Sequence, residues 1–295
     1  MTVFKSGFAA VIGRPNVGKS TLLNSLLDQK ISIVSDKPQT TRNTIQAILT
    51  RSDAQIVFLD TPGIHRPLHK LGEYMVKSAK AALEEVDVIC FMVEVTGWRK
   101  ADEEIIAELG KIDTPVFLVI NKVDLVSDEE QANFLRMVEN KYDFAEIFVL
   151  SALERTGLNQ FVETLVSYLP EGPKYYPDDW VTDHPERFVM AEFIREQILH
   201  NTEEEIPHSV AVDIDEVKAD PEKDLVLVRA TIYVERDSQK GIIIGKRGSM
   251  LKKIGIGARE HIETLLGSQV YLDLWVKVKK DWRNKSGSLS EFGYQ

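Results

Sequence analysis

The sequence predicts a doubly wound α/β domain with a mostly parallel sheet, followed by a smaller α+β domain. Three observations predict this order. Up to about residue 169, short apolar runs alternate with stretches of helical periodicity, a pattern typical of parallel strands joined by helices. A glycine-rich phosphate-binding motif follows the first run. After a proline-rich segment, the pattern changes to helices and strands that each have one polar face.

The predicted strands of the first domain are rich in Val, Ile and Phe and apolar on both faces, as buried parallel strands are. They lie at residues 8–13, 55–60, 86–93, 115–120 and 146–150. The predicted helices lie at residues 21–29, 71–83, 102–109 and 131–141. We place this domain at residues 1–169. Residues 170–181 contain three prolines, which exclude a helix or a central strand and predict a linker.

The second domain, at residues 182–285, begins with a helix at 185–200 whose apolar residues recur at helical spacing. These are Phe188, Ala191, Ile194 and Ile198. Two strands follow, SVAVDIDEV and LVLVRATIYVE, with a turn at 219–221. A glycine-rich segment, a helix at 256–266 and the half-buried strand YLDLWVKVK complete an α-β-β-α-α-β order. We expect residues 286–295 to form a loose tail.

Composition narrows the function classes. The 295 residues are 43% hydrophobic and 28% charged, which excludes a disordered or fibrous chain. Cys90 is the only cysteine, so the sequence holds no disulfide framework and no Cys-based zinc site. The net charge is −10, but residues 240–285 carry eleven Lys or Arg and four Asp or Glu. A basic segment with a net charge of +7 in an acidic chain predicts a polyanionic partner.

The motif GRPNVGKS, at residues 13–20, fits G-x-x-x-x-G-K-[ST] between a strand and a helix. In such a loop, main-chain N–H groups surround the phosphates, and the helix N-terminus adds a favourable partial charge. We expect Lys19 to reach the β- and γ-phosphates and Ser20 to ligate Mg²⁺. The nucleotide contacts assigned to this region are Gly13, Asn16, Val17, Gly18, Lys19, Ser20 and Thr21.

The motif DTPG, at residues 60–63, ends a predicted buried strand and lies 40 residues beyond Ser20. Asp60 at that position is suited to hold Mg²⁺, and the Gly63 N–H to contact the γ-phosphate. Between the motifs, the polar segment 36–43 occupies the place of a switch loop, and we choose Thr41 over Thr40 as its metal ligand. The predicted metal ligands are Ser20, Thr41 and Asp60, and the predicted catalytic residues are Lys19, Thr41 and Gly63.

The motif NKVD, at residues 121–124, predicts guanine as the base. An ionised Asp124 offers two acceptors to the N1–H and N2–H₂ donors of guanine, whereas adenine has neither donor. This argues against an ATPase or a nucleotide kinase. Asn121 and Lys122 would fix the loop and flank the ring. In the segment SAL, formed by Ser151, Ala152 and Leu153, we expect the Ala152 N–H to meet the guanine O6.

The order GxxxxGKS, T, DTPG, NKVD and SAL resembles the translation-factor-related GTPases, and the chain from residue 7 to about 285 resembles their Era-like subfamily. This resemblance implies a GTPase with a C-terminal type II KH domain. Ile64 stands where Ras-like proteins have a water-orienting glutamine, so we expect slow hydrolysis. Related GTPases with the GxPNxGKS form bind K⁺ at the asparagine, here Asn16; a purely loop-stabilising asparagine is the alternative.

The segment GIIIGKRGSMLKKIG contains Gly245-Lys246-Arg247-Gly248, a GxxG at the start of a predicted helix in the basic segment. In a type II KH domain this loop clamps about four single-stranded nucleotides. The expected RNA-binding residues are Gly245, Lys246, Arg247, Gly248, Lys252 and Lys253. We expect Ile242, Ile243 and Ile244 to contribute to an apolar floor under the bases, although plain core packing is the alternative.

The favoured hypothesis is an RNA-binding GTPase switch. The resemblance implies single-stranded 16S ribosomal RNA near its 3′ end and a role in assembly of the 30S subunit. The alternative is an RNA-docking protein in which nucleotide is structural and is hydrolysed little. No apolar run reaches the roughly 18 residues of a membrane span, and the N-terminus lacks the anatomy of a signal peptide. We expect a cytoplasmic monomer; peripheral contact with the inner face of the cell membrane stays open.

Overall fold

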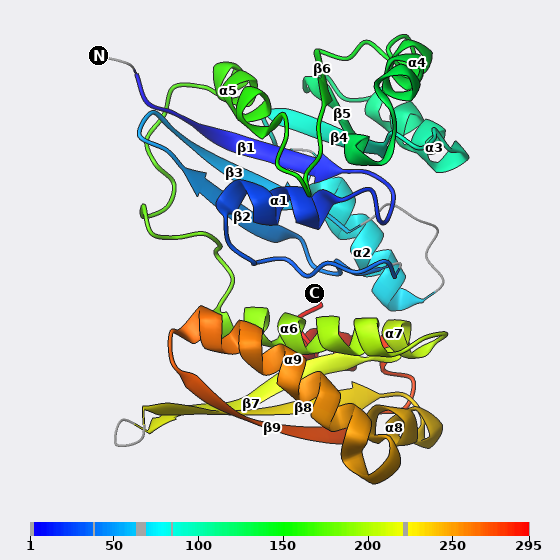
Figure 1. Cartoon of the computed structure of the whole chain (residues 1–295), viewed down its shortest axis with the longest axis vertical. Coiled ribbons are helices and arrows are strands. Elements are labelled where there is room, and N and C mark those ends of the chain that lie inside the picture. Colours follow the sequence, from blue (N-terminus) through cyan, green and yellow to red (C-terminus); the bar gives the residue numbers. More distant parts are fainter. Residues whose placement is uncertain (1–2, 38, 63–68, 84, 221–223, 295) are drawn as a thin grey trace. The chain divides into compact units, whose positions relative to one another are not determined.

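A computed structural model describes residues 3–37, 39–62, 69–83, 85–220 and 224–294 (Figure 1). By their contacts, the residues divide into two compact units. Unit 1 comprises Met1–Ser32, Thr41–Arg66 and Met75–Asp183. Unit 2 comprises Ile33–Thr40, Pro67–Tyr74 and His184–Gln295. Two short segments that belong by sequence to the first predicted domain are therefore counted with the second unit.

Unit 1 is built on a six-stranded sheet in the order β2-β3-β1-β4-β5-β6 (Figure 1). Its strands are β1 (Lys5–Ile12), β2 (Ile45–Thr50), β3 (Ala54–Asp60), β4 (Val88–Glu94), β5 (Val116–Asn121) and β6 (Glu146–Val149). All pairs are parallel except β2 with β3. The five predicted runs are confirmed as strands. The edge strand β2 was not predicted, because polar residues interrupt and end its sequence IQAILT, which leaves an apolar run of only three residues.

Helices pack on both faces of this sheet. They are α1 (Lys19–Leu27), α2 (Lys70–Ala81), α3 (Lys100–Leu109), α4 (Asp128–Val138) and α5 (Leu158–Tyr168). Apolar residues of α3 and α4, including Ile105 and Phe134, share one core cluster with Leu118 of β5. On the other face, Phe117 of β5 packs against Phe148, which in turn meets Phe161 of α5. Because successive side chains of β5 point to opposite faces of the sheet, this strand contributes to the core on each face.

The parallel register brings the predicted motifs to one edge of the sheet. Val11, near the end of β1, lies opposite Asp60, the last residue of β3. Glu94 at the end of β4 lies opposite Asn121 at the end of β5. The loops that leave the carboxyl ends of these strands are therefore neighbours, which is where open α/β sheets bind ligands.

Unit 2 is a three-stranded sheet with helices. Its elements are α6 (Glu186–Asn201), α7 (Ile206–Ser209), β7 (Ala211–Asp220), β8 (Leu225–Val234), α8 (Asp237–Ile244), α9 (Ser249–Leu266), β9 (Gln269–Val278) and α10 (Ser286–Glu291). β7 pairs antiparallel with β8, and β8 pairs parallel with β9. The predicted α-β-β-α-α-β order is confirmed, and β9 alternates as expected: Val270 and Val276 are buried, whereas Tyr271 and Trp275 are exposed.

Helix α9 begins at Ser249, seven residues before the predicted start at residue 256. The helix continues through Gly255 and Gly257. Gly257 packs closely against α6, because a Cβ atom there would lie 2.3 Å from the Gln197 side-chain oxygen. The glycine therefore serves close helix packing rather than a turn.

The segments outside the predicted domains are packed. Gln55 accepts the Tyr175 and Tyr176 N–H groups at 2.7 and 3.0 Å, which fixes the proline-rich linker on unit 1. The C-terminal residues were expected to be loose, and this expectation is wrong. They form α10, and the Tyr294 ring stacks on the fully buried Trp282. The indole N–H donates to Ser209 O at 2.8 Å, so the tail is fixed by an aromatic core.

We predict that Trp282→Ala destabilises unit 2 by about 3–5 kcal/mol, because it leaves a large cavity under the tail and an unpaired carbonyl at Ser209. Trp275→Ala, which removes an exposed indole of the same unit, is the matched control and should cost far less. Hydrogen exchange of amides in β8 reports the stability of this unit directly. Equal protection in the two variants would contradict the assignment of Trp282 to the core.

Candidate nucleotide site and nucleic-acid interface

The phosphate loop requires its two glycines. Gly13 has φ +153° and Gly18 has φ +105°, both in the region that side chains disfavour. A Cβ on Gly13 would lie 2.4 Å from Met92 O, and one on Gly18 would lie 2.2 Å from Asn121 Nδ2. The loop therefore passes close to β4 and β5, and it leads into α1, which begins at Lys19. The N-terminal N–H groups of this helix suit it to bind an anion.

Lys19 is buried in the loop that it is expected to serve. Its Nζ donates to the carbonyl oxygens of Gly13 and Arg14, both at 3.2 Å. Burial lowers the pKa of Lys19, and the nearby Asp60 carboxylate opposes that shift. A polyphosphate in the loop would supply the negative charge that a buried ammonium needs.

The three predicted metal ligands converge. Ser20 Oγ lies 2.9 Å from Asp60 Oδ2 and 3.3 Å from Thr41 Oγ1, and Thr41 Oγ1 lies 3.5 Å from the same carboxylate oxygen. Thr40 is engaged elsewhere, since its hydroxyl donates to Lys37 O at 2.6 Å. The structure thus places Thr41, and not Thr40, beside Ser20 and Asp60.

These residues fit Mg²⁺. The other carboxylate oxygen of Asp60, Oδ1, is buried and has no hydrogen-bond partner within the described residues. Burial raises the pKa of Asp60, although Lys19 and the Ser20 hydroxyl oppose the shift. A buried, under-bonded carboxylate with two hydroxyls is an all-oxygen donor set of the kind that Mg²⁺ prefers.

Asn121 connects the base-binding segments to the phosphate loop. Its Nδ2 donates to Val17 O at 2.8 Å, and its Oδ1 accepts the Ala152 N–H at 2.9 Å. Ser25 of α1 also donates to Ala152 O, at 2.6 Å. The Ala152 N–H, which we expected at the guanine O6, is thus already used by Asn121, because that side chain spans the gap between the two loops.

Asp124 is hydrogen-bonded to the segment SAL. The Ser151 hydroxyl donates to Asp124 Oδ1, and the Glu154 N–H donates to Ser151 Oγ at 3.1 Å. This leaves Oδ2 of Asp124 for a ligand in addition to the second lone pair of Oδ1. Lys122 has φ +66°, and its Nζ lies 3.4 Å from Glu94 Oε2. Leu153 is 70% exposed.

Two residues of the predicted site, Gly63 and Ile64, lie outside the described residues. Sequence reasoning missed Arg14, whose guanidinium binds the fully buried Asp102 of α3 through Nε at 3.0 and 3.1 Å. This ion pair ties the phosphate loop to α3. The two residues are 88 positions apart, and no local sequence pattern indicates that they form a pair.

The GxxG loop joins two helices in unit 2. Gly245, with φ +71°, ends α8, and Gly248, with φ +80°, precedes α9. A Cβ on Gly245 would lie 2.7 Å from that of Met250, so only glycine fits there. Lys246 and Arg247 are exposed at the tip of the loop. The bend thus presents two cations to solvent at the start of a helix.

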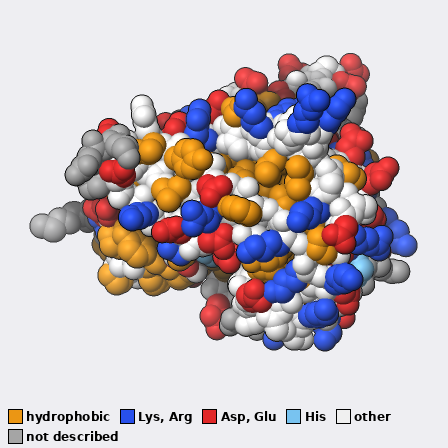
Figure 2. All heavy atoms as spheres, turned by 90° about the horizontal axis from the view of Figure 1, so that it is seen from below, with side chains coloured by type: hydrophobic (Ala, Val, Ile, Leu, Met, Phe, Trp, Pro, Cys, Tyr) orange, Lys and Arg blue, Asp and Glu red, His pale blue; other side chains and the backbone are white. Residues whose placement is uncertain are grey.

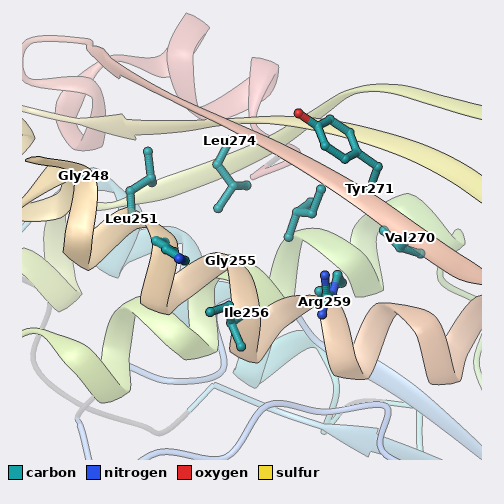
Figure 3. Close-up of a pocket in the computed structure, with 10 residues that line it drawn as sticks. Gly248, Leu251, Gly255, Ile256, Arg259, Val270, Tyr271 and Leu274 are labelled. Carbon is teal, nitrogen blue, oxygen red and sulfur yellow. The ribbon is translucent and has the colours of Figure 1, made fainter.

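A groove of about 320 Å³ runs from this loop between α9 and β9 (Figure 3). Its lining residues are Gly248, Leu251, Lys252, Gly255, Ile256, Arg259, Val270, Tyr271, Leu272 and Leu274. The expected isoleucine floor is therefore wrong. Ile243 is buried in the core and Ile242 is exposed, because the three isoleucines follow one another around helix α8.

The floor is apolar and the rim is basic. Figure 3 shows Leu274 on the side of β9 that faces α9 and the ring of Tyr271 on the other side. Of the predicted lysines, Lys252 lines the groove, whereas Lys253 is exposed and does not. Arg259, one turn beyond Ile256, adds a cation that was not predicted. The space-filling view from below shows hydrophobic, Lys and Arg side chains interspersed with Asp and Glu side chains (Figure 2).

A phosphate loop with a guanine-selective motif, joined to a unit with a GxxG groove, defines a P-loop GTPase that carries a KH domain. Two family profiles agree: one described as a 50S ribosome-binding GTPase matches residues 8–122, and one described as a KH domain matches residues 205–283. The chain hydrolyses GTP as members of this class do.

Two solved structures extend the similarity to the whole chain. One is a variant of Aquifex aeolicus Era bound to GDP·AlF₄⁻, 44% identical over 99% of both chains with a TM-score of 0.94. The other is Era in complex with MgGDPNP and nucleotides 1506–1542 of 16S ribosomal RNA, also 44% identical over 99% of both chains, with a TM-score of 0.95. This chain belongs to the Era family.

We predict that Asp124→Asn weakens GTP binding about 10- to 150-fold, because the amide presents a donor where guanine needs a charged acceptor. Preference should move toward xanthine nucleotides. Titration with GTP and XTP measures both changes, and Asp128→Asn, at an exposed carboxylate at the start of α4, is the matched control. An Asp124→Asn protein that binds GTP like the wild type would refute the base-recognition assignment.

Proposed function

We propose that this protein is a GTP-driven switch that binds single-stranded 16S ribosomal RNA near its 3′ end and assists assembly of the small ribosomal subunit. The observation that carries the proposal is the groove between α9 and β9, with its apolar floor, basic rim and GxxG loop. The relative crystallised with the 16S fragment is similar over 99% of the chain, which supports the same class of RNA.

In the nucleotide site, the polyphosphate would lie against the N-terminus of α1, with Lys19 on its β- and γ-phosphates. Ser20, Asp60 and Thr41 would hold Mg²⁺, as in the relative that carries MgGDPNP. The bound metal would offset the phosphate charge. The Gly63 N–H would contact the γ-phosphate, and loss of this phosphate would release both Gly63 and Thr41.

Hydrolysis in this site is proposed to be slow. Ile64 has no hydrogen-bonding group with which to orient an attacking water. Catalysis therefore depends on electrostatic stabilisation of the charge that develops on the phosphates. Asn16, in the phosphate loop, offers an amide oxygen to a K⁺ ion, which would add positive charge there. The alternative of a merely structural nucleotide is disfavoured, because a relative binds GDP·AlF₄⁻, an imitation of the phosphoryl group in transfer.

The protein is proposed to act as a monomer in the cytoplasm, where small subunits are assembled. Within the described residues, no helix combines the length and apolar character that crossing a bilayer takes. Peripheral contact with the inner face of the membrane stays a prediction from the sequence, as does the monomeric state.

The first test of the mechanism is its cation dependence. We predict that single-turnover GTP hydrolysis is faster in KCl than in NaCl at equal ionic strength, because K⁺ bound at Asn16 would stabilise the transition state. Asn16→Ala should remove this difference and leave the slower rate. Equal wild-type rates in the two salts would exclude a K⁺ site at Asn16.

The second test separates RNA binding from GTP binding. We predict that replacing Lys246 and Arg247 with Asp abolishes binding of single-stranded RNA and leaves GTP affinity unchanged, because the nucleotide site is built in unit 1. Lys111→Asp with Arg136→Asp makes the same charge change at exposed positions of unit 1 and should leave RNA affinity nearly intact.

The salt dependence sharpens this test. Wild-type affinity for RNA should fall with log salt at a slope of about −0.7 per phosphate neutralised on a single strand. The loop variant should bind with a shallower slope. A loop variant that retains wild-type affinity and slope would show that GxxG is not the RNA clamp.

A further inference from the structure

The connection between β4 and α3, residues 94–102, carries none of the predicted site residues, yet it contacts the nucleotide site at two places within unit 1. One contact is an ion pair between two buried residues. Asp102, near the start of α3, is fully buried, and Arg14 of the phosphate loop is 7% exposed. Buried charges are costly unless they are paired and hydrogen-bonded. The partners of this pair therefore indicate what the connection does.

The Asp102 carboxylate joins the phosphate loop to α3. Arg14 Nε donates to both of its oxygens, at 3.1 and 3.0 Å, and the Arg99 N–H donates to Oδ2 at 2.8 Å. The guanidinium also donates through Nη2 to the Gly97 carbonyl oxygen at 3.0 Å. Burial raises the pKa of Asp102, and the Arg99 N–H and the Arg14 charge oppose that shift. The connection thus holds one arginine at two points.

The main chain of the same arginine contacts Lys19. Lys19 Nζ donates to the carbonyl oxygens of Gly13 and Arg14, both at 3.2 Å. These two carbonyls limit where the ammonium group can lie. Because the Arg14 side chain is bound to Asp102 and Gly97, the movement of its carbonyl is restricted as well. The connection therefore reaches the ammonium group of Lys19 through a single residue.

At its other end, the connection contacts the base-recognition motif. Lys122 Nζ lies 3.4 Å from Glu94 Oε2, and the Thr96 hydroxyl donates to Glu94 Oε1 at 2.8 Å. The Val95 N–H donates to the Asn121 carbonyl oxygen at 3.0 Å. Burial raises the pKa of Glu94, but hydrogen bonding by the Thr96 hydroxyl and the charge of Lys122 outweigh this effect and lower the pKa. The Glu94 side chain is therefore a carboxylate opposite the Lys122 ammonium group.

We propose that the β4–α3 connection is a positioning element of the nucleotide site. Asp102 acts through Arg14 on the ammonium group of Lys19. Glu94 acts through Lys122 at the guanine ring. The inference rests on the proposed contacts of Lys19 and Lys122 with the nucleotide. A guanidinium suits the first task, because its planar fork serves a carboxylate and a carbonyl together, and the compact ammonium group of a lysine does not match that geometry.

The main test replaces the buried pair with apolar residues, Arg14→Met with Asp102→Leu. Such a replacement often leaves stability unchanged, but it removes the link between the phosphate loop and α3. The single-turnover rate at saturating GTP should fall about tenfold or more, because small misplacement of a catalytic group has large effects. Arg51→Met with Asp53→Leu removes a more exposed pair of unit 1 with a 3.0 Å contact and should leave the rate unchanged.

Hydrogen exchange of amides in β5 reports whether unit 1 is folded. If the double variant loses protection there, then Arg14→Lys decides, because it keeps a positive charge opposite Asp102 and loses the planar fork that also reaches Gly97. A slower saturating rate in a folded variant supports the inference, since a purely structural pair would change protection and not this rate. A folded variant with the wild-type rate overturns it.

Glu94→Gln tests the other end of the connection, because it removes the charge opposite Lys122 and keeps the shape of the side chain. It should weaken GTP and GDP binding equally, up to about fivefold, since both nucleotides carry the same base. The rate at saturating GTP should not change. Glu108→Gln, at an exposed carboxylate of α3, is the matched control. Unchanged affinity for both nucleotides would overturn the role of Glu94.

Lys19→Ala separates this inference from the proposed function. A Lys19→Ala protein that hydrolyses GTP at the wild-type rate would refute the proposed mechanism itself. If Lys19→Ala abolishes hydrolysis and the folded Arg14→Met, Asp102→Leu protein retains the wild-type rate, only the positioning role of the connection is overturned.

Discussion

The parallel pairing of β1 with β3 and β4, and of β4 with β5, is the constraint on which the nucleotide site depends. It brings the carboxyl ends of four strands to one edge of the sheet, so that motifs far apart in the chain become neighbours. Asn121 then joins two of them by hydrogen bonds to Val17 and Ala152. Because the strand register already places these loops close together, a short side chain such as that of Asn121 is long enough to connect two of them.

The same edge concentrates buried charge. Lys19 and Asp60 are both buried, and burial shifts the pKa of each toward its neutral form. Such a pair is poorly stabilised without a ligand. Its charged forms become more stable when a phosphate contacts the ammonium group and a cation contacts the carboxylate. The energetic cost of these groups in the free protein is thus consistent with selection for binding rather than for stability.

The sequence predicted most of the framework, because two-sided apolar runs and loop motifs are local signals. The prediction failed where a side chain's hydrogen-bond partner is distant in the sequence. Glu196 accepts from the Val34 N–H, 162 positions away, and Arg195 donates to the Thr40 carbonyl, 155 positions away. Helical periodicity contains no information about these partners, so it predicted a simple amphipathic helix for α6. The isoleucines of α8 were misjudged for a different reason, since consecutive helical residues point to different faces and cannot all line one floor. The apolar floor instead comes from α9 and β9.

The two activities of the chain differ in how they depend on its main chain. The groove of unit 2 is defined by α9 and β9, elements adjacent in sequence, and no part of it comes from unit 1. The nucleotide site instead gathers residues from loops that follow separate strands of unit 1, so it depends on the pairing of β1 with β3 and β4 and of β4 with β5.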